Sequence, residues 1–276
     1  MKFLLLLFTV LLPLSAQPAL PDDPYLRSVE EWHRARINGL KREHSWVSLI
    51  ALDWLKQGEQ TVPGVGTLTL SGSVVILRVE QGRTATLNGQ PFSADTVTPD
   101  KDKIIVGPKA AAVIERGGRF AVRVWDADVP ARKAFTGIER YPVDPQWRIE
   151  ARWIAYTTPK TIEIPTVIPD LLQEGIVPGV AVFTIDGKEY RLEPTIEEGS
   201  DELFFVFGDR TNGKETYGAG RFLYSAAPKE GKVILDFNRS YNPPCVFTDY
   251  ATCPVPLPEN RLNVRIPAGE KNFRHH

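Results

Sequence analysis

The chain has 276 residues, with 33 Lys and Arg against 34 Asp and Glu and a formal net charge of −1. This balance gives no electrostatic reason to expect binding to nucleic acid or to an anionic membrane surface. Two cysteines and four histidines argue against a Cys/His metal cluster, and we predict neither a metal nor a cofactor. The 23 prolines and 21 glycines favour many turns over long helices.

The first segment predicts a secretory signal peptide at residues 1–19. Lys2 precedes an unbroken apolar run from Phe3 to Leu14, and small residues follow it. A run of about 12 residues is too short to span a bilayer but fits the apolar region of a leader peptide. No later apolar run is long enough for a membrane helix. We therefore expect an exported protein, periplasmic or extracellular, in which residues 20–276 form a single β-rich domain.

Residues Pro24 to Arg42 predict one long helix. The aspartates before Pro24 and the proline itself form a typical helix start, because proline is favoured in the first turn. We interpret His33, within this helix, as a structural hydrogen-bonding group. The aromatic stretch from His44 to Leu55 is interpreted as core. Apolar residues recur in the helix at roughly helical spacing, as Val29, Trp32, Ile37 and Leu40.

Short strands with turns between them are predicted from Thr61 onward. Asn88-Gly89 and Asp186-Gly187 are two-residue hairpin signals. Leu203 to Phe207 is wholly apolar and predicts a central strand. The expected strands are 67–70, 74–79, 84–87, 90–92, 103–106, 111–114, 120–125, 148–157, 161–167, 180–185, 188–192, 203–207 and 233–237. We therefore expect a mostly β fold, an antiparallel sandwich or barrel with one N-terminal helix and a Pro-rich C-terminal loop. A subdivision near residue 135 would separate a sandwich-like first half from a motif-bearing second half.

Basic residues gather in and before the polar segment 126–148. Arginine forks suit carboxylate or phosphate, so one interpretation is a wall that recognises an anion. The other is an ordinary surface held by salt bridges to Asp126 and Asp128. The basic residues are Arg119, Arg123, Arg132, Lys133, Arg140 and Arg148.

The stretch from Thr211 to Glu270 holds both cysteines and the densest run of Asn, Tyr, Asp, Arg and Pro in the sequence. Its core, residues 236–259, contains Asn242-Pro243-Pro244 and three further prolines, which keep the backbone extended and stiff. Such a segment loses little entropy on ordering and can hold side chains in place without regular hydrogen bonding. Two interpretations stay open, a strap that covers a sheet edge and a functional site.

Cys245 and Cys253 lie eight positions apart in this stretch. In an oxidising compartment the default for two cysteines is a disulfide, which we predict here. In the chain-entropy model it would stabilise the fold by roughly 2–3 kcal/mol. Free core thiols and a catalytic thiol are the alternatives, and the last of these needs a nearby base and reducing conditions.

A small-molecule pocket beside the cysteine loop is the function that we expect. Tyrosine and asparagine beside an arginine suit a sugar or a small carboxylate, through stacking and directional hydrogen bonds. One alternative is a hydrolase with Asp236 and Glu259 as base and acid, which requires the two to lie close together. Another is a structural envelope protein without a ligand. The oligomeric state stays open. The expected ligand-binding residues are Tyr217, Arg221, Asp236, Asn238, Tyr241, Asn242 and Asn260.

A series of short segments runs through residues 209–270, with related pieces at 46–58 and 135–148. They include Thr216-Tyr217, Gly220-Arg221-Phe222-Leu223, Leu235-Asp236-Phe237-Asn238, Tyr241-Asn242-Pro243, Cys253-Pro254 and Glu259-Asn260-Arg261-Leu262. This pattern resembles the bacterial and archaeal family catalogued as domain of unknown function 1684. The resemblance covers nearly all of the mature chain and implies a family but no activity, because the family's function is unassigned. The first half is also faintly similar to a forkhead-associated sandwich. It is short at 60–65, where that module's phosphate-reading loop would lie, so we predict no phosphopeptide binding.

Overall fold

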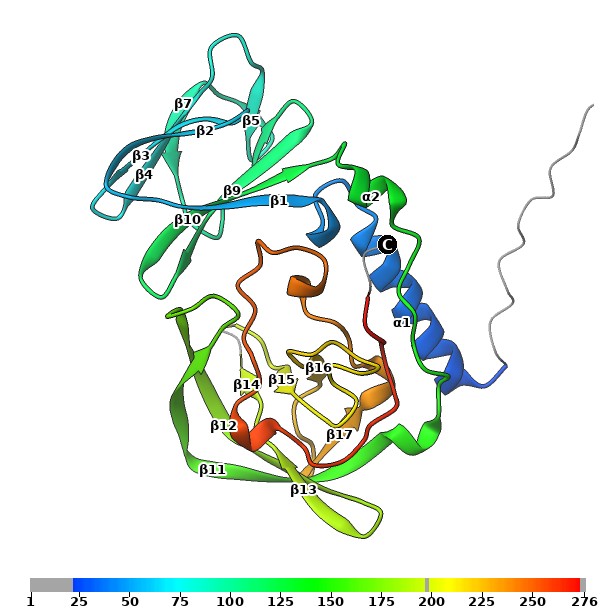
Figure 1. Cartoon of the computed structure of the whole chain (residues 1–276). Helices are drawn as coiled ribbons and strands as arrows, with labels where there is room; N and C mark the ends of the chain where they lie inside the picture. Colours follow the sequence, from blue (N-terminus) through cyan, green and yellow to red (C-terminus); the bar gives the residue numbers. More distant parts are fainter. Residues whose placement is uncertain (1–21, 197–198, 274–276) are drawn as a thin grey trace, which may run out of the picture.

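The computed structural model describes residues 22–196 and 199–273. The predicted signal peptide lies outside the described residues, as do His275 and His276. The described chain is mostly antiparallel β-structure in two halves (Figure 1), which confirms the fold class expected from the sequence. Within this part of the chain, no helix combines the length and the apolar character that a membrane crossing requires.

The first half is a sandwich of two antiparallel sheets. The sheets share one core, because Leu68 and Leu77 of the smaller sheet pack with Ile104, Val113 and Val122 of the larger one. The larger sheet has the order β1 (Leu49–Trp54), β10 (Arg119–Asp126), β9 (Lys109–Arg116), β8 (Ile104–Val106), β5 (Ala85–Leu87) and β6 (Gln90–Pro91). The smaller has the order β2 (Gly58–Val62), β3 (Gly66–Ser71), β4 (Val74–Val79) and β7 (Ala94–Val97).

The hairpins predicted for this half are confirmed. β3 pairs with β4, and β5 pairs with β6 around Asn88 and Gly89, whose φ angles of 51° and 84° are those that the turn requires. Strands β1, β2 and β7 fall where no strand is predicted. β1 lies within the stretch interpreted as core, and it forms the edge of the larger sheet beside β10.

The second half is a seven-stranded antiparallel sheet that curls into a nearly closed barrel (Figure 1). Its interior is filled by apolar side chains such as Phe205, Phe207 and Leu223. β15 is buried at every position and is flanked by β14 and β16, which confirms the predicted central strand. The strands are β11 (Arg148–Pro165), β12 (Leu172–Ile185), β13 (Lys188–Leu192), β14 (Thr195–Ile196), β15 (Leu203–Phe207), β16 (Arg221–Ser225) and β17 (Lys232–Asp236).

One prediction for this half is wrong. The segments 148–157 and 161–167 form a single strand, β11, which changes register with β12 between Ala155 and Lys160. Pro159, which interrupts the sequence pattern, lies within this irregularity. A strand tolerates a residue without an N–H at such a position.

Helix α1 (Pro24–Leu40) lies along one side of both halves (Figure 1). Asp23 caps it, since its Oδ1 accepts from the N–H groups of Tyr25 and Leu26 at 2.8 and 3.0 Å. The helix ends at Leu40, two residues before its predicted end. A second, short helix, α2 (Pro130–Ala134), lies in the polar segment between the halves.

After β17 the described chain contains only short 3-10 turns, at Phe237–Arg239, Pro244–Val246 and Pro258–Asn260. We call residues 237–273 the C-terminal segment. It contacts both halves: Thr248 Oγ1 donates to the carbonyl of Leu49 at 3.0 Å in the sandwich. The N–H of Val167 donates to the carbonyl of Cys253 at 2.9 Å beside the barrel. The C-terminal segment therefore connects the two halves.

Candidate functional site

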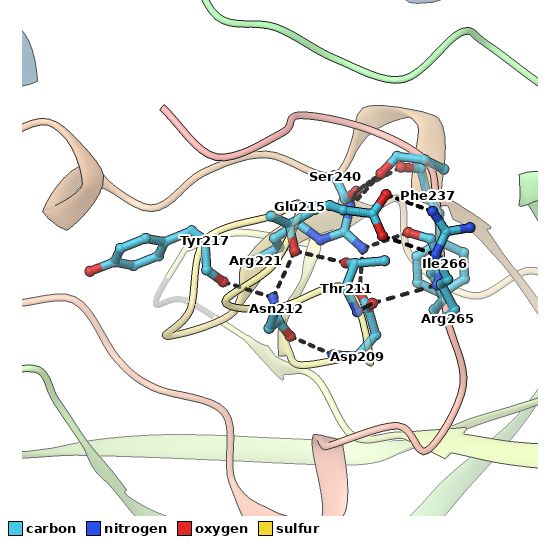
Figure 2. Close-up of polar contacts among 12 residues, drawn as sticks. Asp209, Thr211, Asn212, Glu215, Tyr217, Arg221, Phe237, Ser240, Arg265 and Ile266 are labelled. Carbon is cyan, nitrogen blue, oxygen red and sulfur yellow. Dashed lines mark hydrogen bonds and ion pairs between the residues drawn. The ribbon is translucent and has the colours of Figure 1, made fainter. Parts of the chain in front are cut away.

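Arg221 lies at the centre of a buried network (Figure 2). Its side chain has no exposed surface, and its guanidinium lies 5.1 Å from the centre of the Phe207 ring. An arginine with several acceptors and no contact with water holds loops together, because each acceptor offsets part of the cost of burying the charge. Its acceptors are the Asp209 carboxylate, the carbonyl oxygens of Ile266 (3.0 Å) and Ala268, and Ser240 Oγ (3.2 Å).

Asp236 and Asn238 fasten the start of α1 to the barrel. The hydroxyl of Tyr25 donates to Asp236 Oδ1 at 2.8 Å and accepts from Asn238 Nδ2 at 2.8 Å. Burial, helped by the Asp236 carboxylate, raises the pKa of Tyr25, which keeps this hydroxyl protonated. Asp236 also pairs with Arg239 at 3.2 Å and lines an open hollow on the barrel.

Tyr241 and Asn242 lie beside a second ion pair from α1. Arg36 binds both oxygens of the fully buried Glu270, at 2.5 and 3.1 Å, and donates to the carbonyl of Asn242 at 2.9 Å. The same guanidinium lies 4.4 Å from the centre of the Tyr241 ring. The N–H of Asn242 donates to Glu270 at 2.8 Å, so the backbone at these two predicted site residues is held firmly.

Asn260 and Glu259 lie on the last 3-10 turn. The Asn260 side chain accepts from the N–H of Glu193 at 2.9 Å and donates to its carbonyl at 2.8 Å. Asn260 also lines a cavity of about 270 Å³ on the barrel. Glu259 is exposed and lines neither this cavity nor the hollow beside Asp236. The catalytic pair of Asp236 and Glu259 therefore stays a prediction, and the two residues share neither of these cavities.

Cys245 and Cys253 lie in contact as free thiols. The N–H of Cys245 donates to Cys253 Sγ at 3.2 Å. A hydrogen bond between the two side chains lowers the pKa of Cys245 and raises that of Cys253. Tyr217, whose ring points away from the Arg221 network in Figure 2, hydrogen-bonds to Cys245. The two thiols are adjacent, as a disulfide requires, and the disulfide itself stays a prediction.

A groove of about 920 Å³ lies between the two halves, bordered by β10, α1 and the C-terminal segment. This volume is in the range of small-molecule sites. Among the described residues that line it are four arginines and His44, but no Asp or Glu. Two of the predicted ligand-binding residues, Tyr241 and Asn242, are part of it. Its aromatic lining consists of Trp32, Trp46, Trp125, Phe204, Phe222, Tyr224, Tyr241 and Phe247.

Arg123, on β10, is the distinctive residue of the groove. It is 8% exposed, and its Nη2 donates to Thr252 Oγ1 at 3.0 Å, while its Nε has no hydrogen-bond partner. Its guanidinium lies 5.1 Å from the centre of the Trp46 ring. Burial lowers the pKa of Arg123 to about 10, so the group is still charged at neutral pH. A buried arginine without a carboxylate partner is costly, and an anion placed in the groove would offset that cost.

The other lining arginines differ from Arg123. Arg36 is paired with Glu270, Arg116 pairs with Asp100 at 2.8 Å, and Arg42 is exposed. Arg123 is thus the one buried lining arginine, within the described chain, that lacks an acidic partner.

Two further polar atoms on the groove wall are buried without a partner. They are Asn242 Oδ1 and His44 Nε2. Burial lowers the pKa of His44, which leaves its ring neutral at neutral pH. The ring also forms a hydrogen bond with the backbone of Pro108. Buried polar atoms are normally hydrogen-bonded, and these two atoms and Arg123 Nε, all around the groove, have no partner among the described residues. The described residues bring no three His, Cys, Asp or Glu side chains together as metal ligands.

The seven predicted ligand-binding residues are therefore distributed over separate places. Tyr241 and Asn242 line the groove, while Asp236 and Asn260 line two other cavities. Arg221 and Asn238 are buried in networks that hold the fold together. Tyr217 hydrogen-bonds to Cys245. Arg123 was not among these seven residues. The sequence analysis named it among the basic residues that one interpretation assigns to a wall that recognises an anion.

Comparison with known proteins adds a family but no activity. The model of the family described as "Protein of unknown function (DUF1684)" matches residues 133–271. A search of curated proteins gives no match. Among solved structures, the chain is similar to a solution NMR structure of an uncharacterized protein of Haloarcula marismortui. The two are 28% identical over 54% of this chain and 83% of that one, with a TM-score of 0.45.

Proposed function

This chain belongs to the DUF1684 family, and since the family's description assigns no activity, we propose a function from the groove itself: the protein binds a small organic acid as its carboxylate. The observation that carries the proposal is Arg123, a buried arginine that lines the groove, has an unpaired Nε and has no acidic partner. The proposal applies to the exported form expected from the leader-like segment at residues 1–19.

A carboxylate fits the groove better than a neutral sugar. The guanidinium fork of Arg123 can donate two parallel hydrogen bonds to one carboxylate, and such charged bonds are stronger than neutral ones. No Asp or Glu among the described lining residues would repel the anion. The rings of Trp46, Trp125 and Tyr241 provide apolar walls for the rest of the ligand.

The test uses 3-phenylpropionate and its neutral amide, 3-phenylpropionamide, as a matched pair of probes. Calorimetric titration should show that the acid binds and that the amide binds tenfold or more weakly, because a hydrogen bond to a charged group contributes about 1.5–3 kcal/mol. Arg123→Gln should remove this difference, since it keeps a donor but removes the charge.

The matched control is Arg119→Gln. Arg119 lies on the same strand, β10, but its guanidinium stacks over the Trp54 ring at 4.1 Å and does not line the groove. This variant should retain the preference for the acid. Equal affinity for acid and amide in the unmodified protein, no binding of either probe, or an unchanged preference in Arg123→Gln would each contradict the proposal.

A further inference from the structure

The sandwich wall of the groove is the outer face of β10. Val122 and Val124 pack in the core of the sandwich, and successive side chains of a strand point to opposite faces. Arg123 and Trp125, which both line the groove, therefore lie next to each other on the other face of this strand. A ligand whose carboxylate binds Arg123 has the Trp125 ring beside it along the same strand face.

Trp125 differs from the other two tryptophans that line the groove. Trp32 packs against the Tyr241 ring with 6.2 Å between the ring centres, and the Trp46 ring lies 5.1 Å from the guanidinium of Arg123. The half-buried Trp125 forms no aromatic or cation–π pair within the described chain, and its indole N–H donates no hydrogen bond there. The ring of Trp125 is therefore available to a ligand, on the same strand face as the arginine that lacks an acidic partner.

The barrel wall of the groove carries a group of aromatic rings that pack with one another. Leu223 faces the interior of the barrel, so Phe222 and Tyr224 of the same strand point outward, beside Phe204 of β15. The Phe204 ring centre lies 4.9 Å from that of Phe222 and 4.8 Å from that of Tyr224. The Tyr241 ring follows at 5.8 Å from Phe222. Since all these spacings fall within the roughly 4.5–7 Å that aromatic pairs prefer, the barrel side offers the groove an ordered aromatic surface.

We infer that the ligand of the groove is an aromatic carboxylate, whose carboxylate binds Arg123 and whose ring stacks on Trp125. This inference rests on the proposed function, because it takes the carboxylate site as given and adds the ring site. A flat ring gains stacking energy beyond the apolar area that it buries, whereas an aliphatic chain gains from buried area alone. One aromatic acid thus supplies both an anion for Arg123 and a ring partner for Trp125.

The experiment compares 3-phenylpropionate with 3-cyclohexylpropionate by calorimetric titration. The two acids have the same charge and the same linker, and the saturated ring buries at least as much apolar area as the phenyl ring. The phenyl acid should nevertheless bind about two- to tenfold more tightly, because stacking adds to area burial. In Trp125→Leu this preference should disappear, while 3-phenylpropionate should still bind more tightly than its amide. Trp125→Phe keeps a ring at this position and should retain part of the preference.

Trp54→Leu is the matched control. Trp54 is half-buried like Trp125 and lies in the same sheet, on β1, but its ring stacks with Arg119 at 4.1 Å and does not line the groove. This variant makes the same substitution away from the groove and should keep the preference for the phenyl acid.

The outcomes separate this inference from the proposed function. If the cyclohexyl acid binds as tightly as the phenyl acid, or if Trp125→Leu leaves the preference intact, the ring site is wrong and the carboxylate site stands. If 3-phenylpropionate and its amide bind equally, or if neither acid binds, both are wrong.

Discussion

Two buried arginines in this protein have opposite surroundings. Arg221, in the barrel half, has no exposed surface, pairs with Asp209 and donates to three further acceptors. Arg123, in the sandwich half, is 8% exposed and has one neutral acceptor, Thr252 Oγ1, with its Nε unpaired. The Nε of Arg221 is also without a partner, but its charge is balanced by Asp209, whereas the charge of Arg123 has no acidic partner.

The difference separates a structural role from a binding role. A buried charge is costly unless its partners offset the loss of hydration. Arg221 recovers that cost within the folded chain and connects β16 to the C-terminal segment. Arg123 does not, and a group that is costly in the free protein gains most when a ligand supplies the missing partner.

The largest effect is expected from breaking the compensated pair. Arg221→Met leaves the carboxylate of Asp209, whose side chain has no exposed surface, without its counterion. Removing one partner of a buried pair typically costs about 3–5 kcal/mol of unfolding free energy. Urea denaturation measures this directly.

The double variant Arg221→Met/Asp209→Asn sharpens the test. It removes both charges and should be more stable than Arg221→Met alone, because no unpaired carboxylate remains. If the single variant unfolds at the same urea concentration as the unmodified protein, the network in Figure 2 does not hold the fold.

A somewhat smaller loss is expected from Gly269→Ala, on the other side of the same network. Gly269 has a φ of 76°, and a Cβ there would overlap both the hydroxyl and the carbonyl of Ser240, a partner of Arg221. Backbone strain and the forced shift together should cost about 2–4 kcal/mol. Thermal melting checks the effect, and Gly213→Ala is the matched control. Gly213 has a φ of 77° with no atom near the added Cβ, so only the strain should remain.

Much of the fold could be predicted from local patterns. Asn88-Gly89 specifies its turn through positive φ angles, and Leu203 to Phe207 is apolar at every position because it is buried on both faces. The error at β11 arose because Pro159 ends a strand in most sequences, whereas here it falls in a change of register. Local sequence does not say which partner strand continues past a proline.

The site was harder to predict, because its residues belong to separate parts of the chain. Arg123 and Thr252 are 129 positions apart, and only the packing of the two halves brings them together. A dense polar motif such as 209–221 suggests a binding site, yet many of its polar side chains form hydrogen bonds within the folded chain. The informative property of Arg123 is the absence of an acidic partner, and a linear sequence does not display absences of this kind.

A small effect on stability is expected where Arg123 itself is changed. Arg123→Met removes a buried charge that has no acidic partner, so the unfolding free energy should stay within about 1 kcal/mol of the unmodified protein or rise. Carboxylate binding should be lost at the same time. Urea denaturation and titration with 3-phenylpropionate measure the two effects together. A loss as large as that of Arg221→Met would mean that both arginines are structural and would remove the distinction between them.

The smallest effect concerns the pH dependence of stability and two histidines, His33 on α1 and His44 in the groove lining. His33 lies near the Arg36–Glu270 pair, and His44 lines the same groove as Arg123. Burial is the main cause that lowers the pKa of each below its ordinary value of 6.5, with Arg140 adding to it for His33 and Lys103 for His44. As the pH falls below 6.5, the unfolded state therefore takes up the proton first. The stability that each neutral ring contributes is present above that pH and lost below it.

Urea denaturation between pH 7 and pH 5 should show this loss, and His33→Gln or His44→Gln should each reduce its slope. An anion in the groove favours the protonated form of a nearby histidine and so raises its pKa. Saturation with 3-phenylpropionate should then reduce the contribution of His44 and leave that of His33 unchanged. Equal changes in the contributions of His33 and His44 to the pH dependence would show that the anion binds away from Arg123. Only the unfolding free energies of the variants would then distinguish Arg123 from Arg221.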